Sequence, residues 1–280
     1  MATIQNTGFD KLHRHVRKKI LVTFHGLAPS QLLGRFVGPK VLLNSIPKAG
    51  THLLERALDQ FPLIRNAGQK TLMAPQELEN HILQKILSIK KGQFLNAHLQ
   101  AHPLLLQKLS ESDIKILLMI RDPRDVALSR VKYVVNIDRT HKTTHYLAGL
   151  KDDNERLEAS IRGIPGILLP VHEIFERFAP WLEHPNVIIC RFEDLVGESG
   201  GGNKNRQIQL VKKLILFLEL EVEEKKIELI ADKIFSPKSS TFNKGAIGGW
   251  KNIFNTNHKK MFLDTGREIL ELYGYGANGE

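Results

Sequence analysis

Residues 41–54 read VLLNSIPKAGTHLL and contain an apolar run, a short turn with one glycine, and the start of an amphipathic segment. The apolar run stops at Pro47, which predicts a short buried strand, and the spacing from Thr51 onward predicts a helix. A strand that turns tightly into a helix directs several backbone N–H groups at one place, and Lys48 adds a positive charge beside them. The stretch therefore predicts an anion-binding turn. The alternative is an ordinary strand-to-helix turn with a surface lysine.

Three further apolar runs, at 93–97, 114–120 and 186–190, resemble this first strand. They alternate with segments of helical periodicity at 51–60, 75–89, 103–110, 123–137, 166–182, 204–219, 222–235 and 258–273. Such alternation predicts an α/β fold with a central parallel sheet flanked by helices. We expect one domain over 40–280, with residues 1–39 as an N-terminal extension packed on it. In these sheets ligands bind beyond the carboxyl ends of the strands.

The composition is that of an ordinary globular protein, with 280 residues, 42% hydrophobic and 25% charged. No apolar run approaches the roughly 18 residues of a membrane span, and we expect a cytoplasmic protein without a membrane partner. The single cysteine, Cys190, excludes an intramolecular disulfide and any cysteine-rich metal site, so no metal is expected. The net charge of +10 fits either an anionic partner or a merely soluble basic surface.

A second candidate anion site follows the strand at 114–120. Arg121 stands at the end of that strand, and Ser129 lies two helical turns further on. An arginine and a hydroxyl on one side of a helix can grip a phosphate. The alternative is that the aspartates of this turn, Asp122 and Asp125, only pair with Arg124.

A third candidate lies near the C-terminus, where residues 242–254 read FNKGAIGGWKNIF. Backbone N–H groups of this glycine-rich segment and the Lys244 ammonium could close over an anion. The alternative is a flexible loop that Trp250 anchors by its hydrophobic ring.

Together and in this order, these segments resemble the PAPS-dependent sulfotransferases, whose donor is 3′-phosphoadenosine 5′-phosphosulfate (PAPS). Residues 47–51, PKAGT, are similar to the PKSGT loop of that family. Residues 121–129 are similar to its R-x-x-x-D-x-x-x-S segment, and residues 242–250 to its F-R-K-G-x-x-G-D-W loop. Residues 190–195, CRFEDL, resemble its -x-Y-E-D-L segment. The matches span residues 41–254 and imply a single α/β domain like that of a nucleotide kinase.

The resemblance also implies a donor site. Lys48, Gly50 and Thr51 would hold the 5′-phosphosulfate, and Arg121 with Ser129 would hold the 3′-phosphate. The full implied set of donor-binding residues is Lys48, Ala49, Gly50, Thr51, His52, Leu53, Arg121, Ser129, Phe192, Phe242, Asn243, Lys244 and Gly245. The product would be 3′-phosphoadenosine 5′-phosphate (PAP).

Four positions depart from the family pattern. His52 replaces a frequent second threonine, and Leu53 replaces a frequent tryptophan beside the adenine. Asn243 replaces the arginine of the closing loop, and Gly249 replaces the aspartate before Trp250. The loss of that arginine removes a fork-shaped phosphate ligand.

The resemblance assigns the general base to His98, which follows the strand at 93–97 and would deprotonate a hydroxyl or amine of the acceptor. Lys48 would stabilise the leaving oxygen. The alternative for His98 is a hydrogen-bonded structural histidine, and His102 is a weaker candidate for the base. Gln69 stands where tyrosine sulfotransferases have acidic residues and cannot act as a base, which argues against that branch.

The residues at 133–165 are polar with few aromatics, so we expect them to form a mobile lid over a small, polar acceptor. Two other functions stay open at this point. One is a kinase that uses ATP. The order of Lys48 and Gly50 argues against it, because in a Walker A loop the lysine follows the glycine. The other is a non-catalytic module for polyanions, although no nucleic-acid motif appears and no nucleic-acid partner is expected. The oligomeric state is left open.

Overall fold

The computed structural model describes residues 29–73, 78–136, 142–235 and 247–276. The strands are β1 (Lys40–Ser45), β2 (Arg65–Asn66), β3 (Leu72–Met73), β4 (Gln93–His98), β5 (Ile114–Ile120) and β6 (Val187–Arg191). The longer helices are α2 (Pro29–Val37), α3 (Thr51–Leu58), α4 (Asn80–Leu87), α5 (Pro103–Ser110), α6 (Pro123–Asn136), α8 (Asp153–Arg162), α9 (Val171–Phe178), α11 (Lys204–Phe217), α12 (Glu224–Ile234) and α14 (Thr256–Leu272). The short ones are α7 (Lys142–Ala148), α10 (Phe192–Leu195) and α13 (Trp250–Ile253), with η1 (Ala179–Glu183) and η2 (Glu198–Gly200) of 3₁₀ type.

All pairings in the central sheet are parallel, and its strand order is β2-β4-β1-β5-β6. The short β3 pairs with β4 further along the edge that β2 occupies. Strands β1 and β5 lie in the middle and are almost wholly buried, which explains their near-continuous apolar sequences. The predicted α/β fold with a parallel sheet is therefore confirmed.

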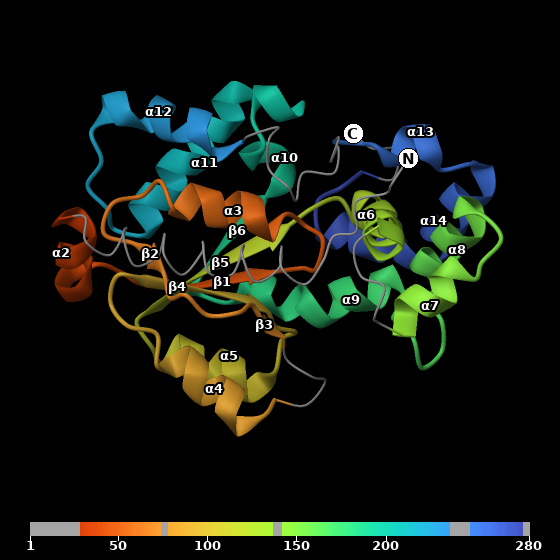
Figure 1. Ribbon diagram of the computed structural model, residues 1–280, viewed down its shortest axis with the longest axis horizontal. Coiled ribbons are helices and arrows are strands. Elements are labelled where there is room, and N and C mark those ends of the chain that lie inside the picture. The colour runs from red at the N-terminus through yellow and green to blue at the C-terminus, as the bar shows by residue number, and fades with distance from the viewer. Residues whose placement is uncertain (1–28, 74–77, 137–141, 236–246, 277–280) are drawn as a thin grey trace, which may run out of the picture.

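Helices cover both faces of the sheet. In Figure 1, α3, α11 and α12 lie over one face, and α4, α5 and α9 lie over the other. Helices α6, α7, α8 and α14 gather at one end of the molecule, beyond β5 and β6. The carboxyl ends of β1, β4, β5 and β6 point toward that end, so the turns that follow these strands form one edge.

The expected elements match the observed ones with two instructive differences. The expected helix at 166–182 begins only at Val171, because Pro170 precedes it and Gly163 and Gly166 adopt positive φ. Within the expected lid, residues 153–162 form helix α8, where Leu157 and Ile161 are buried and α6 is a neighbour. That part of the expected lid is packed into the fold.

Of the expected N-terminal extension, the structure describes α2 and the two residues after it. A Cβ on Gly34 would come within 2.2 Å of the Leu63 carbonyl oxygen, so α2 approaches the main domain backbone to backbone. In the ranges that the structure describes, no helix combines the length and apolar character needed to cross a membrane.

Candidate functional site

The loop between β1 and α3 is a tight left-handed turn. Lys48 has φ 72° and Gly50 has φ 113°, and the Ala49 N–H donates to the Ile46 carbonyl at 3.0 Å. Positive φ is rare for a residue with a side chain, and such strain is characteristic of functional loops. The Leu53 and Leu54 N–H groups donate to the Gly50 carbonyl, whereas those of Thr51 and His52 precede the first of these bonds and open onto the turn. The geometry is that of an anion-binding turn.

Lys48 is half-buried in this loop. Burial lowers the pKa of its ammonium from the ordinary 10.5 to about 8. A cation that is partly removed from water interacts more strongly with a nearby anion than an exposed one does. Lys48 thus places a partly buried positive charge beside the N-terminus of α3.

The loop rests on Phe192, the first residue of α10. A Cβ on Gly50 would lie 2.7 Å from Phe192 Cδ2, so only glycine fits here. The Arg121 guanidinium packs over the same ring, with its carbon 4.2 Å from the ring centroid. Phe192 and Arg121 are only 7% and 6% exposed. Three segments that the sequence singled out separately thus meet at one ring.

Arg121 is tied in turn to the chain before α13. Its Nη2 lies 3.5 Å from Asp125 Oδ2, and that carboxylate also accepts hydrogen bonds from the backbone N–H groups of Gly248 (2.8 Å) and Trp250 (3.0 Å). Burial raises the pKa of Asp125, while Arg121 and the two N–H donors oppose the rise. Asp125 therefore joins the Arg121 turn to the end of the glycine-rich segment.

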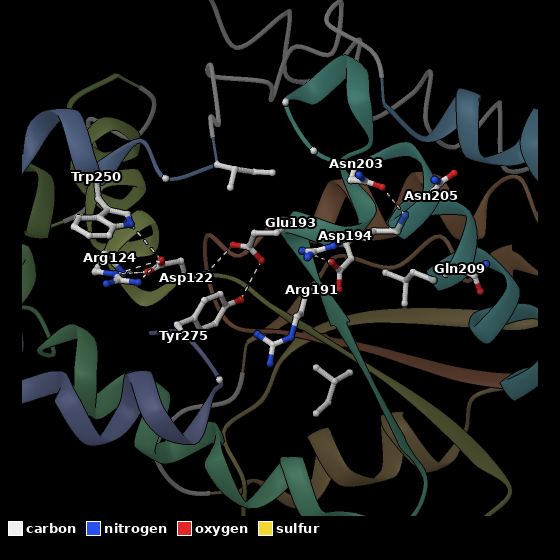
Figure 2. A pocket seen from close by; sticks show the side chains of 18 of the residues that line it. Asp122, Arg124, Arg191, Glu193, Asp194, Asn203, Asn205, Gln209, Trp250 and Tyr275 are labelled. Carbon is white, nitrogen blue, oxygen red and sulfur yellow. Dashed lines mark hydrogen bonds and ion pairs between the residues drawn. The ribbon is translucent and has the colours of Figure 1, made fainter. Parts of the chain in front are cut away.

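Asp122 and Arg124 hold the Trp250 side chain in the same region. The Trp250 indole Nε1 donates to Asp122 Oδ2 at 3.2 Å, and the Arg124 guanidinium stacks over the indole at 4.0 Å (Figure 2). Arg124 also pairs with Asp122 at 2.8 Å. The alternative expectation, that the aspartates of this turn pair with Arg124, thus holds for Asp122. Asp125 pairs with Arg121 instead. The buried Trp250 ring anchors the end of the glycine-rich segment, as the alternative for that segment expected.

The remaining expected donor residues are placed as follows. Ser129 is half-buried on α6, two turns beyond the start of the helix. Ala49 is buried under the loop and Leu53 packs against the core, while His52 is exposed at the start of α3. Four expected residues lie outside the described residues: Phe242, Asn243, Lys244 and Gly245.

His98 ends strand β4, directly beside the end of β1. Its Nδ1 lies 2.7 Å from the Ser45 carbonyl oxygen. A carbonyl only accepts, so Nδ1 carries the hydrogen and Nε2 keeps its lone pair. Burial lowers the pKa of His98, the bond to Ser45 opposes this, and the charges of Lys48 and His52 lower it further. The neutral, proton-accepting imidazole is therefore favoured.

Two polar residues at the end of β1 join the loop to His98. The Ser45 hydroxyl accepts from Thr51 Oγ1 at 2.9 Å, while the Ser45 carbonyl holds His98. Asn44 forms two hydrogen bonds with the backbone of Leu99, of 2.9 and 2.8 Å. By contrast, His102 caps α5, because its Nδ1 accepts from the Leu104 N–H.

A cavity of about 1000 Å³ is lined in part by Asp122 and Glu193 (Figure 2). Its walls carry both charges, with Arg191, Arg206 and Lys213 among the cations. Lys48, Gly50, His98, Arg121 and Phe192 do not line it. The cavity is therefore distinct from the anion-binding turn.

Comparison with known proteins bears on the family. The family model described as "Sulfotransferase domain" matches residues 38–240, which is most of the chain. The chain belongs to this sulfotransferase family. A search of curated protein sequences found no significant match.

Two solved structures resemble this chain over most of its length. The mouse sulfotransferase SULT7A1, "complexed with PAP", is 20% identical, covers 89% of this chain and 94% of its own, and has a TM-score of 0.58. Retinol dehydratase "in complex with androsterone and inactive cofactor PAP" is 14% identical, covers 89% and 85%, and has a TM-score of 0.53. At these identities the likeness shows that the sulfotransferase shares their fold.

Sequence reasoning missed several residues that support the site of this sulfotransferase. Glu193 Oε1 accepts from the Asp122 N–H and its Oε2 accepts from the Tyr275 hydroxyl, both at 3.0 Å (Figure 2). Burial raises the pKa of Glu193, and it raises that of Tyr275 well above the ordinary value. A signal was available for Asn44 and Ser45, because polar residues at the carboxyl end of an apolar strand are exceptional. Nothing in the sequence pairs Glu193 with Tyr275.

Proposed function

We propose that this protein transfers a sulfuryl group from PAPS to a hydroxyl or amine of a small, polar acceptor. The observation that carries the proposal is the contact of Gly50 and Arg121 with the same Phe192 ring. It brings the loop expected to hold the 5′-phosphosulfate next to the arginine expected to hold the 3′-phosphate. The match to the sulfotransferase domain and the PAP bound in both related structures support the same donor.

The residues of the loop fit such a donor. Lys48 and Arg121 supply positive charge, and the left-handed turn at Gly50 leaves the helix N-terminus open to an anion. A terminal phosphate carries about −1.5 to −2 charges at neutral pH, which these cations would balance. We assign the 5′-phosphosulfate to Lys48, Gly50 and Thr51, with Ala49, His52 and Leu53 as the other donor-binding residues of this segment. We assign the nucleoside and 3′-phosphate to Arg121, Ser129, Phe192, Phe242, Asn243, Lys244 and Gly245.

The donor supplies the sulfuryl group, and in-line displacement needs positioning and charge stabilisation more than covalent chemistry from the protein. Lys48 is the residue proposed to stabilise charge on the leaving oxygen. His98 Nε2 is proposed to accept the acceptor's proton, because Nδ1 is committed to Ser45 and the pKa of the ring is lowered. His98 and Thr51 both bond to Ser45, so His98 lies beside the loop that carries Lys48, which suits a shared reaction site.

Donor binding is tested by thermal unfolding with PAP, ADP and ATP at equal concentration. PAP at 100 times its dissociation constant should stabilise the protein by about 2.7 kcal/mol. ADP and ATP should stabilise it far less, because they lack the 3′-phosphate. An equal shift with ADP, or none with PAP, would remove the proposed donor.

Catalysis is tested by His98→Ala, with His102→Ala as the matched control on the following helix. Loss of a general base lowers turnover by about 10²–10⁴-fold. We expect that loss for His98→Ala with PAP binding retained, and near-normal turnover for His102→Ala, whose ring only caps α5. Undiminished turnover in His98→Ala would exclude His98 as the base.

A further inference from the structure

His52 and Glu55 form a hydrogen-bonded pair at the mouth of the β1–α3 loop. His52 Nδ1 lies 3.1 Å from Glu55 Oε2, one helical turn further along α3. The imidazole is 60% exposed, whereas the Glu55 side chain is only 9% exposed. The pair thus has one end at the loop and the other in the protein interior.

The buried carboxylate is itself held from the sheet. Asn66 Nδ2, on β2, donates to Glu55 Oε1 at 2.8 Å, and Asn66 Oδ1 accepts from the Gly68 N–H at 2.8 Å. Asn66 is 7% exposed. These two hydrogen bonds determine the orientation of the Asn66 amide. The oriented amide in turn holds the Glu55 carboxylate in place. A chain of buried polar contacts runs from the sheet edge to His52.

This chain determines which imidazole nitrogen is available. A carboxylate only accepts, so His52 Nδ1 donates to Glu55. The oxygens of a phosphosulfate also only accept, so Nε2 must carry a second hydrogen to bind them, and the ring that binds is the imidazolium, with Glu55 as its counter-charge. His52 is the second residue of α3, where backbone N–H groups also point at the anion-binding turn. Its charge influences His98, so the two rings share one neighbourhood. The other charged groups near His52 are Lys48 in the loop and Arg56 on the next turn of the helix.

We propose that Glu55, anchored by Asn66, is a positioning residue that holds His52 so that Nε2 binds the donor's phosphosulfate. The inference rests on the proposed function and deepens it, because it explains how a histidine serves where a hydroxyl side chain is frequent in the family. The buried Glu55–Asn66 pair supplies the orientation that a short hydroxyl side chain would not need. His52 is the binding group, and Glu55 acts only through it.

The test is PAP affinity in a double-mutant cycle, measured by calorimetry. A charge-assisted hydrogen bond is worth about tenfold or more in affinity, so His52→Ala should weaken PAP binding by about that factor. His52→Thr should restore part of it. Glu55→Gln should weaken PAP binding by about threefold to tenfold with His52 present, and have no further effect in the His52→Thr protein. An equal effect of Glu55→Gln in both backgrounds would show a structural role and overturn the proposal.

The chain offers a matched control in His81 and Glu79. Their Nδ1–Oε2 distance is 2.9 Å, both side chains are more than half exposed, and they lie at the start of α4 across the sheet from α3 (Figure 1). Glu79→Gln should leave PAP affinity unchanged. Unmeasurable PAP binding by the unmutated protein would instead be a failure of the proposed function.

A spectroscopic measurement keeps the proposal testable if Glu55→Gln fails to fold. Nitrogen-15 spectra of the PAP complex of the unmutated protein should show a hydrogen on both ring nitrogens of His52. The Nε2 resonance of His52 should move on addition of PAP, while that of His81 should not. A His52 ring without a hydrogen on Nε2 in the PAP complex, or one insensitive to PAP, would contradict the assignment.

Discussion

Asp125 offers the sharpest test of how the site is held together. Its carboxylate accepts hydrogen bonds from the Gly248 and Trp250 N–H groups at 2.8 and 3.0 Å, and Arg121 lies 3.5 Å away. Asp125→Ala removes both acceptors and the negative charge facing Arg121. Asp125→Asn preserves the volume and one acceptor oxygen.

The magnitude follows from what each change leaves behind. A buried donor that loses its acceptor costs about 1–3 kcal/mol. Trp250 is buried, whereas Gly248 is half-buried and water can replace part of its bond. Burial raises the pKa of Asp125, so the ionised carboxylate already has a desolvation cost that its removal relieves. We expect a net loss of about 2–4 kcal/mol for Asp125→Ala and about 1–2 kcal/mol for Asp125→Asn.

The assay is urea unfolding at pH 7, comparing the free energy of unfolding in the absence of denaturant. Asp113→Ala is the control, because Asp113 pairs with Lys40 at 2.9 Å and its side chain is 64% exposed. Exposed pairs contribute about 0–1 kcal/mol. The reasoning is refuted if Asp125→Ala costs no more than Asp113→Ala. An equal cost for Asp125→Asn and Asp125→Ala would show that charge matters more than the number of acceptors.

Three more predictions concern the loop and the base. The acidic limb of the pH–rate profile should lie below pH 6.5, the ordinary pKa of imidazole, because the pKa of His98 is lowered and its neutral form persists as the pH falls. A limb above that value would contradict the geometry. Since the pKa of Lys48 is about 8, PAP binding at pH 8 should take up about half a proton, and affinity should fall above that pH. Calorimetry in buffers of different ionisation enthalpy measures the uptake, and a zero result would count against Lys48 as an anion ligand. Gly50→Ala should destabilise the protein by about 2–4 kcal/mol, from positive φ and from the clash with Phe192. Gly201→Ala is the control in urea unfolding, since its φ is also positive but its Cβ would meet no atom, and it should cost only about 1 kcal/mol.

The backbone organisation was predictable because it depends on local sequence. The apolar run at 114–120 became β5 with the same bounds, and the helix expected at 103–110 became α5. A run of buried apolar residues and a proline at a helix start act over a few neighbours, so one sequence suffices to find them. The short β2 and β3, of two residues each, carry no such pattern and were not predicted.

The candidate site was predictable as a set of segments and not as a set of contacts. Lys48, His98 and Arg121 were identified because each follows a buried strand, and in a parallel sheet these strand ends share one edge. Which side chains touch depends on the strand order, and it involves residues that are about 70 or more positions apart in the sequence. The Phe192 ring between Gly50 and Arg121 is such a contact, and so is the bond from Asp125 to Trp250.

The sequence by itself thus determined the α/β class, the anion-binding turn and the family resemblance, because short motifs encode local geometry and charge. Only the tertiary structure decided which nitrogen of His98 carries the hydrogen and which residues hold the side chains of the site in place. Ser45 fixes the His98 tautomer, and Asn66 fixes Glu55, through hydrogen bonds between neighbouring strands or between sheet and helix. Burial, which lowers the pKa of Lys48, is a property of the whole fold and of no single segment.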